Sequence, residues 1–262
     1  MKLHIVPART GWLWVRQGIQ AFWKQPLALA ALFFMAMASM SLVTVVPFIG
    51  PAVALALLPA ATLAMMVATA ETLQGRFPTP ALLLVAFRAE RQRLRAMLVL
   101  GALYAVGFLA IMGLSALIDG GRFAQVYLGG EPLSREVAED PAFQAAMWVA
   151  MALYMPLSML FWHAPGLVHW HGVPPVKSLF FSAVACLRNF WAFTVFGLAW
   201  MGVFLVAGLV VALVTGLLAA LVGNMAAGVM VGAAMVLAAM FFSSVVFTFR
   251  DCFEPPEQSN TP

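Results

Sequence analysis

Three of the four histidines, His163, His169 and His171, lie in the short segment 161–175. Neutral imidazole is a common ligand of zinc, copper and haem iron, so this segment is the first place where cofactor chemistry has to be considered. A metal site needs further ligands, and the segment itself holds no carboxylate and no thiol.

An interfacial role explains the same segment without a metal. Histidine and tryptophan are amphipathic and gather where hydrocarbon meets water. Additional ligands such as Glu71 or Cys186 would have to come from distant parts of the chain. We therefore expect no metal and no cofactor, rank a ligand or partner site second, and favour anchoring at the membrane interface. The candidate partner or ligand residues are His163, His169, Trp170 and His171.

The prolines and glycines of this segment predict its shape. Pro165, Gly166, Gly172, Pro174 and Pro175 oppose a continuous helix. Non-helical backbone near a membrane must find hydrogen-bond partners or line a wet cavity. The sequence therefore predicts an ordered loop that folds back under the helical bundle, with a tryptophan at the level of the lipid headgroups.

No other part of the sequence has the spacing of a catalytic site. The chain contains no H-E-x-x-H, no G-x-S-x-G, no Walker A sequence and no pair of aspartates within an apolar tract. Nothing places a nucleophile next to a base. We predict that the protein is not an enzyme and assign no catalytic residues.

Apolar tracts without any charged residue or histidine cover most of the chain. The chain is 64% hydrophobic and 9% charged, with a mean hydropathy of +0.97, and a helix of roughly 20 apolar residues crosses a bilayer. The first tract is broken at 47–51 and the last near Gly223-Asn224. The fold class predicted is an all-α integral membrane protein, with 1–262 as a single polytopic domain. The six predicted transmembrane helices cover 27–46, 51–70, 96–118, 142–162, 191–216 and 225–249.

The basic residues predict the orientation. Of the 14 Lys and Arg, all but Arg122 and Arg135 fall on one side of these spans, and short cytoplasmic loops carry such an excess. Both termini should therefore be cytoplasmic and the acidic segment 119–141 outside, with Asp140-Pro141 starting the fourth span. The net charge of +4 points to the lipid bilayer and its anionic headgroups as partners, and not to nucleic acid.

Three stretches, 12–24, 81–95 and 176–188, combine an apolar face with a basic face at helical spacing. Such stretches next to a span are typical of helices that lie on the membrane; the alternative is that they extend the spans into the cytoplasm. Each precedes two spans. The pattern therefore predicts three cytoplasmic-face amphipathic helices, within three parallel repeats of one helix and one hairpin.

Small residues predict where helices pack. Ala52, Ala56, Ala60, Ala64 and Ala68 recur every four residues, and Asn224, Gly228 and Gly232 do the same in the last span. Small side chains let helix backbones approach closely in lipid. We expect packing within the chain, with a homodimer through Gly228 and Gly232 as the alternative.

Transport would need polar groups near the middle of the membrane. The spans offer only Ser, Thr, Tyr and Asn, so ion-coupled transport is not expected. Pro59 and Pro156 are candidate midplane breaks at equivalent repeat positions. We therefore favour a non-enzymatic membrane protein that organises, assists or regulates a membrane partner or lipid. The alternative is a transporter or permease for a neutral or amphipathic solute.

Three blocks carry a family resemblance: Val6-Pro7-Ala8-Arg9, the turn 75–78 and, above all, 161–182. With them, nearly the whole chain resembles an uncharacterised family of bacterial inner-membrane proteins, the BPSS-named six-span family. More loosely, the helix-plus-hairpin plan looks like YciC-like envelope proteins. The resemblance implies six helices and a place in the bacterial inner membrane. It implies no activity and no catalytic residues.

Overall fold

A computed structural model of the chain describes residues 2–222 and 226–254. The described residues are helical apart from turns, loops and one isolated antiparallel bridge between Leu3 and Phe253. Six helices are long and apolar enough to cross a membrane, which confirms the predicted fold class. They are α2 (Pro26–Thr44), α3 (Gly50–Leu73), α4 (Arg91–Asp119), α7 (Pro141–Phe161), α10 (Phe190–Val222) and α11 (Ala226–Cys252). The expected break at Gly223-Asn224 lies outside the described residues.

Shorter helices connect these spans: α1 (Thr10–Lys24), α5 (Arg122–Gly129), α6 (Arg135–Glu139), α8 (Ala164–His171) and α9 (Pro175–Arg188). Thus α1 and α9 form where amphipathic helices were predicted. The segment 81–95 does not form one helix. It contains only the 3-10 helix η1 (Pro80–Leu84), which starts at a proline, and turns before α4 begins.

The chain divides into two compact units. Unit 1 comprises Met1–Ala38, Ala61–Arg88 and Val184–Pro262, and unit 2 comprises Ser39–Ala60 and Ala89–Ala183. Both units are built from helices that pack side by side.

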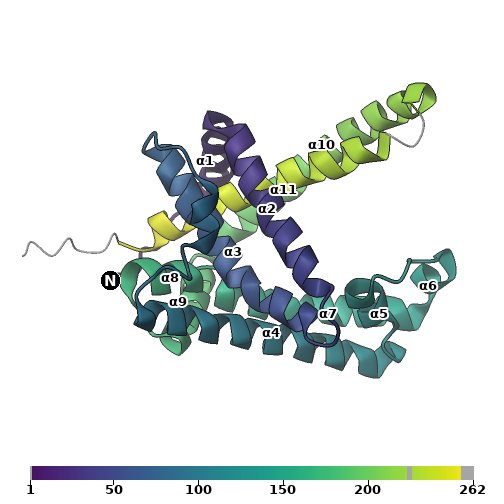
Figure 1. The fold of residues 1–262 in the computed structure, drawn as a ribbon, viewed down its shortest axis with the longest axis horizontal. Helices are drawn as coiled ribbons and strands as arrows, with labels where there is room; N and C mark the ends of the chain where they lie inside the picture. Colours follow the sequence, from purple (N-terminus) through teal and green to yellow (C-terminus); the bar gives the residue numbers. More distant parts are fainter. Residues whose placement is uncertain (1, 223–225, 255–262) are drawn as a thin grey trace, which may run out of the picture. The chain divides into compact units, whose positions relative to one another are not determined.

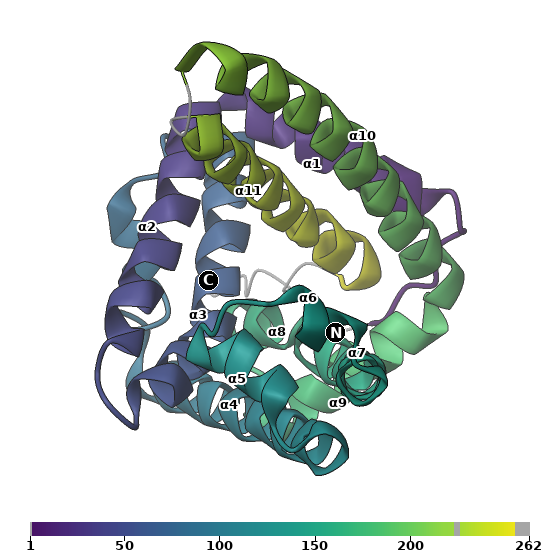
Figure 2. The same cartoon turned by 90° about the vertical axis from the view of Figure 1, so that its right-hand side faces the viewer.

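In unit 1, α1 packs against both α10 and α11 (Figure 2). Its buried face includes Trp14, Val15, Gly18 and Phe22, whereas Trp12 is 54% exposed. Trp23 is exposed as well and lies outside this buried face. A side chain added at Gly18 would collide with Ser244 of α11. The packed stripe therefore follows the small residues that allow close backbone approach.

Both ends of the described chain meet at Asn189 in unit 1. Its Oδ1 accepts from the amide of Val6 (2.8 Å), and its Nδ2 donates to the carbonyl of His4 (3.0 Å). The His4 amide donates to the carbonyl of Cys252 (2.9 Å). One buried amide side chain thus holds the N-terminal segment against the end of α11.

In unit 2, α4 runs along α7, with α5 and α6 at one end and α8 at the other (Figure 1). Gly101 of α4 lies against the carbonyl of Ala56 of α3, where a side chain would not fit. The hydroxyls of Tyr104 and Tyr154 lie 3.3 Å apart and join α4 to α7. Ala56 belongs to the predicted alanine ladder, so this part of the ladder is a packing face.

The structure confirms the predicted start of α7 but shows no helix end at the two prolines within the spans. Asp140 caps α7 by accepting from the amide of Ala142 (2.9 Å), with Pro141 in the first turn, which confirms the predicted helix start. Both α3 and α7 continue through their prolines, Pro59 and Pro156. Neither proline ends its helix; a midplane kink stays a prediction.

Candidate functional site

The histidine segment contains a short helix, α8, where a non-helical loop was expected. Pro165 and Gly166 do not interrupt it because they stand in its first turn, where backbone amides have no partner within the helix. Gly172 ends the helix in the left-handed conformation (φ 61°). The chain is therefore broken before His163 and after His171, but it is helical in between.

His163 is a structural residue of unit 2. It is fully buried, and its backbone amide donates to Oγ of Ser182 (2.9 Å). The same hydroxyl donates to the carbonyl of Met159 (2.7 Å). Ser182 thus bridges the end of α7 and the start of the α8 region, at the point where the backbone leaves the helix.

The other two histidines point in different directions. His169 and His171 are two residues apart on a helix, which separates them by about 200° around its axis. The ring of His169 meets that of Trp170 edge to face at 5.5 Å. Among the described residues, no group of three His, Cys, Asp or Glu is placed to hold a metal.

The two distant residues considered as extra ligands, Glu71 and Cys186, belong to unit 1, whereas the three histidines belong to unit 2. Glu71 pairs with Arg76 through a 2.7 Å contact from Oε1 to Nη2. Cys186 is buried in unit 1. Burial, followed by the neighbouring Cys252, raises the pKa of the Cys186 thiol. The expectation that the protein holds no metal stays a prediction.

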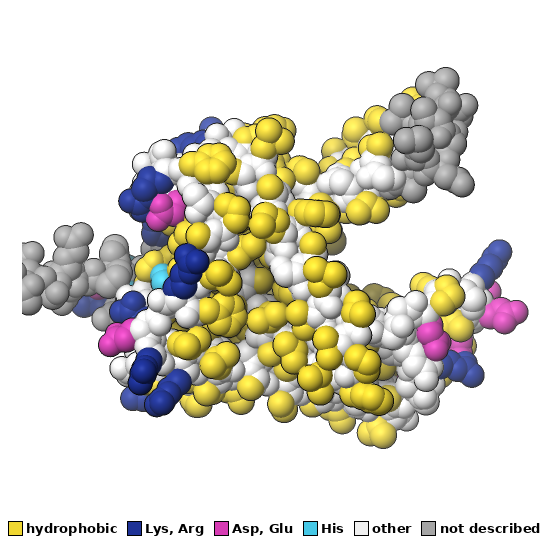
Figure 3. Space-filling view, viewed as in Figure 1, with side chains coloured by type: hydrophobic (Ala, Val, Ile, Leu, Met, Phe, Trp, Pro, Cys, Tyr) yellow, Lys and Arg dark blue, Asp and Glu magenta, His cyan; other side chains and the backbone are white. Residues whose placement is uncertain are grey.

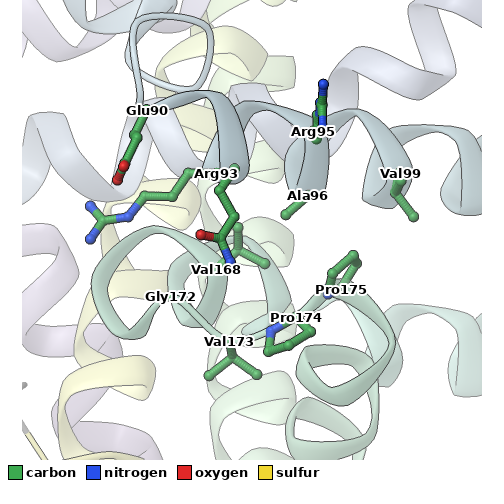
Figure 4. A pocket seen from close by; sticks show the side chains of 11 residues that line it. Glu90, Arg93, Arg95, Ala96, Val99, Val168, Gly172, Val173, Pro174 and Pro175 are labelled. Carbon is green, nitrogen blue, oxygen red and sulfur yellow. The ribbon is translucent and has the colours of Figure 1, made fainter.

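A cavity lies beside α8. It has a volume of about 350 Å³ and lies where the first turns of α4, the end of α8 and the start of α9 meet (Figure 4). We call it the basic cavity. Its polar lining consists of Glu90, Gln92, Arg93 and Arg95, and its apolar lining of Ala96, Val99, Val168, Val173, Pro174 and Pro175, together with the backbone of Gly172.

The charge of this cavity is not neutralised locally. Figure 4 shows the side chains of Glu90 and Arg93 extending to the same side. However, none of the ion pairs among the described residues involves Arg93 or Arg95. By contrast, Arg122 contacts Asp140 at 2.6 Å. The cavity therefore holds two uncompensated guanidinium groups and one carboxylate.

Charged side chains gather at the two ends of unit 2. Figure 3 shows mainly Lys and Arg side chains at the end where α4 begins, and acidic side chains together with Lys or Arg side chains at the other end, over α5 and α6. At the α5 and α6 end, an acidic side chain accepts hydrogen bonds from backbone amides of the same segment. Asp119 accepts from the amides of Gly121 (2.9 Å) and Phe123 (2.6 Å) at the start of α5.

A second, smaller cavity lies near the α5 and α6 end. It has a volume of about 100 Å³ and is lined almost entirely by apolar and aromatic side chains, including Phe108, Phe123, Tyr127 and Tyr154. Burial and the nearby Tyr154 raise the pKa of the Tyr127 phenol. This cavity offers stacking surfaces but no charged group.

The sequence analysis missed the basic cavity. Its two sides, 90–99 and 168–175, are far apart in the chain and meet only through folding. The available signal was that the arginines before the third span have no acidic residue at helical spacing apart from Glu90. Of the predicted candidate residues, the structure places His169 and His171 on the helix beside the cavity, and neither lines it.

Comparison with known proteins supports the resemblance seen in the sequence. A probable inner membrane protein of Burkholderia thailandensis is 42% identical to the chain over 272 residues, covering 100% of the chain and 99% of that protein. No protein-family model matches the chain, and no solved structure matches it. The chain therefore belongs to the same family of bacterial inner-membrane proteins as this full-length relative.

Proposed function

We propose that the protein has no catalytic activity of its own and organises, assists or regulates a membrane partner or a lipid in the inner membrane. The observation that carries this proposal is the use of the polar side chains within the spans. They hydrogen-bond to the backbone of their own helices, which leaves few groups to act on a solute or a substrate.

The pattern recurs in α3, α4, α7, α10 and α11. The hydroxyl of Thr69 donates to the carbonyl of Met65 (2.9 Å), and Ser115 to that of Met112 (2.8 Å). A hydroxyl bonded to a carbonyl three or four residues earlier is satisfied within its own helix. The same arrangement holds for Thr72, Ser158, Thr194, Ser243, Ser244 and Thr248.

The helix faces available to partners carry apolar side chains on α10 and glycines on α11. On α10, Leu198, Leu205 and Leu213 are each more than half exposed. On α11, Gly228 and Gly232 have no atom of the described residues near the position that a side chain would occupy. Small residues on an open helix face allow a second helix to approach closely, which suits a membrane-protein partner or a homodimer.

The transporter alternative would use the region around Pro156. There, Ser158 donates to the carbonyl of Met155 (2.7 Å), and the Tyr154 hydroxyl lies 3.3 Å from that of Tyr104. These contacts engage the groups that a neutral solute would need. The organising role is therefore the better supported of the two, and nucleic acid is not proposed as a partner.

Extraction from native membranes tests the proposal. The full-length protein, purified in mild detergent after chemical crosslinking, should carry a stoichiometric protein partner, a second copy or a retained lipid. Deleting its gene should alter the composition of the envelope. A lipid-free monomer combined with an unchanged envelope contradicts the proposal. Solute flux in proteoliposomes, abolished by Ser158→Ala, would instead favour the transporter.

A further inference from the structure

We propose that the basic cavity binds the phosphate group of an anionic phospholipid, with Arg93 as the phosphate ligand and Arg95, on another side of α4, adding positive charge to the lining. This inference rests on the proposed function, and on the lipid as the partner within it. It adds a defined site, a named ligand and a chemical class of lipid to a role that was stated only in general terms.

The first argument is charge. Arg93 and Arg95 have no carboxylate partner among the ion pairs of the described residues, and Glu90 is the one acidic residue in the cavity lining. The lining therefore carries one net positive charge, which matches the single negative charge of a phosphodiester. Guanidinium groups bind phosphate through charge-assisted hydrogen bonds, often with two parallel donors.

The second argument is the position of the helix ends. Pro174 and Pro175 line the cavity, and α9 begins at Pro175. The N-terminal end of a helix carries a partial positive charge and unsatisfied amide donors. Arg93 and this helix end therefore offer positive charge to the same cavity from two different elements of unit 2 (Figure 4).

The third argument is the division of the lining into polar and apolar parts. Past Arg95, the cavity wall continues as Ala96 and Val99 of α4, and it is closed on other sides by Val168 and Val173. Inorganic phosphate makes no use of such an apolar wall. The glycerol backbone and first methylene groups of a lipid gain free energy by burying against it. At about 350 Å³, the cavity has the size of a small-ligand site.

The fourth argument is depth. Arg95 is followed by the uncharged tract 96–118, so it is the last charged residue before the hydrocarbon-spanning part of α4. Arginine at this position lies at the level of the lipid phosphates. A lipid can therefore enter the cavity sideways from the bilayer, whereas a soluble acidic protein would meet only the exposed ends of the arginines.

Lipid titration with native mass spectrometry tests the site on the full-length protein in detergent. The probe is short-chain phosphatidylglycerol, with phosphatidylcholine of equal chain length as the comparison lipid. The test variant Arg93→Gln/Arg95→Gln removes two charges from the cavity. The matched control Arg88→Gln/Arg91→Gln removes two charges from the same stretch but from outside the lining. Val173→Trp fills the cavity without changing its charge.

The expected result is saturable binding that weakens about tenfold or more in Arg93→Gln/Arg95→Gln and in Val173→Trp, and less than about threefold in the control. Equal losses in both arginine pairs would mean that only the general basic surface attracts lipid, which overturns the proposal. So would the absence of saturable binding to the unmodified protein, or an unchanged affinity in Val173→Trp. Circular dichroism and elution volume establish that each variant is folded.

Two soluble anions identify the source of the phosphate. Inorganic phosphate and glycerol 3-phosphate should displace the lipid only at concentrations far above its own, since they lack the apolar contacts. Displacement at equal concentration would make this a site for a free phosphate and overturn the lipid assignment. The proposed function is tested separately, by copurified protein partners and by the composition of the envelope. The lipid site can therefore be disproved while the proposed function still holds.

Discussion

The indole Nε1 of Trp14 donates a hydrogen bond of 2.9 Å to Oδ2 of Asp251, which joins α1 to the last turn of α11. Trp14 is fully buried, and its ring also packs against Phe193 and Phe196 of α10. One side chain therefore ties together the three helices that form the packed part of unit 1. This makes α1 a structural component of the helical bundle.

Replacing Trp14 with phenylalanine should destabilise the protein. Trp14→Phe keeps an aromatic ring but removes the donor, and Asp251 remains partly exposed, so the expected loss is about 1–2 kcal/mol. Thermal unfolding in detergent measures it. Trp12→Phe, on the exposed side of the same helix, should change the midpoint little. Equal shifts for the two variants would contradict the role given to the hydrogen bond.

Asn189 should control the order of the N-terminus. Asn189→Ala removes the acceptor for the Val6 amide and the donor to the His4 carbonyl, so the first residues should detach from α11 while the helices stay folded. Hydrogen exchange at residues 3–6 should rise strongly. Gln20→Ala, at an exposed position of α1, is the control. Unchanged protection in Asn189→Ala would show that the terminal bridge at Leu3 suffices without it.

The close approach of α3 and α4 at Gly101 predicts opposite effects for two glycines of the same helix. Gly101→Ala would push its methyl group into the carbonyl of Ala56, whereas no atom of the described part of the chain lies within 4 Å of a methyl group added at Gly113. The first change should cost about 1–3 kcal/mol through overpacking. The second should be neutral or stabilise by about 0.5–1 kcal/mol through helix propensity. Unfolding in denaturing detergent compares them, and similar effects at both sites would refute the packing argument.

Features of the fold that depend on residues close together in the sequence could be predicted, whereas features that depend on distant residues could not. The spans follow from hydropathy alone, because a bilayer imposes the same length and composition on every crossing helix. The cap formed by Asp140 and Pro141 is also local, and it forms as predicted. The failure over 81–95 is informative: its arginine spacing suits a helix, but the prolines before it favour a 3-10 turn and delay the helix to Arg91.

Sites formed by segments that are far apart in the sequence could not be predicted from local residue patterns. The histidines were chosen for their chemistry, yet folding buries His163 as a core residue and leaves the arginines around the cavity without partners. The buried face of α1 also depends on contacts with distant segments. Periodicity alone does not distinguish the large residues that face lipid from the small ones that pack, such as Gly18 against Ser244.

The thiol of Cys186 should be unreactive in the folded protein. Burial raises its pKa, and the neighbouring Cys252 raises it further, so the thiolate that attacks maleimides is scarce at neutral pH. Labelling followed by peptide mass spectrometry should find little adduct at pH 7.5 and full reaction after denaturation. Leu187→Cys, next to it and on the exposed side of α9, is the reactive control. Equally fast labelling of Cys186 would show that α9 opens readily.

Glu90 provides the last prediction, because its carboxylate opposes an anion in the basic cavity. Glu90→Gln keeps the shape of the lining and removes its only negative charge, so the cavity should bind anionic lipid more tightly, by about three- to tenfold. Glu131→Gln, an exposed acidic residue at the other end of unit 2, makes the same change in net charge and should leave the affinity unaltered. Phosphatidylglycerol titrations at low and high salt measure both variants. Salt should reduce the gain, since it screens partly exposed charges. Weaker binding in Glu90→Gln would contradict this prediction. It would mean that the Glu90 carboxylate holds Arg93 in its binding position, so that Glu90 is a positioning residue of the site.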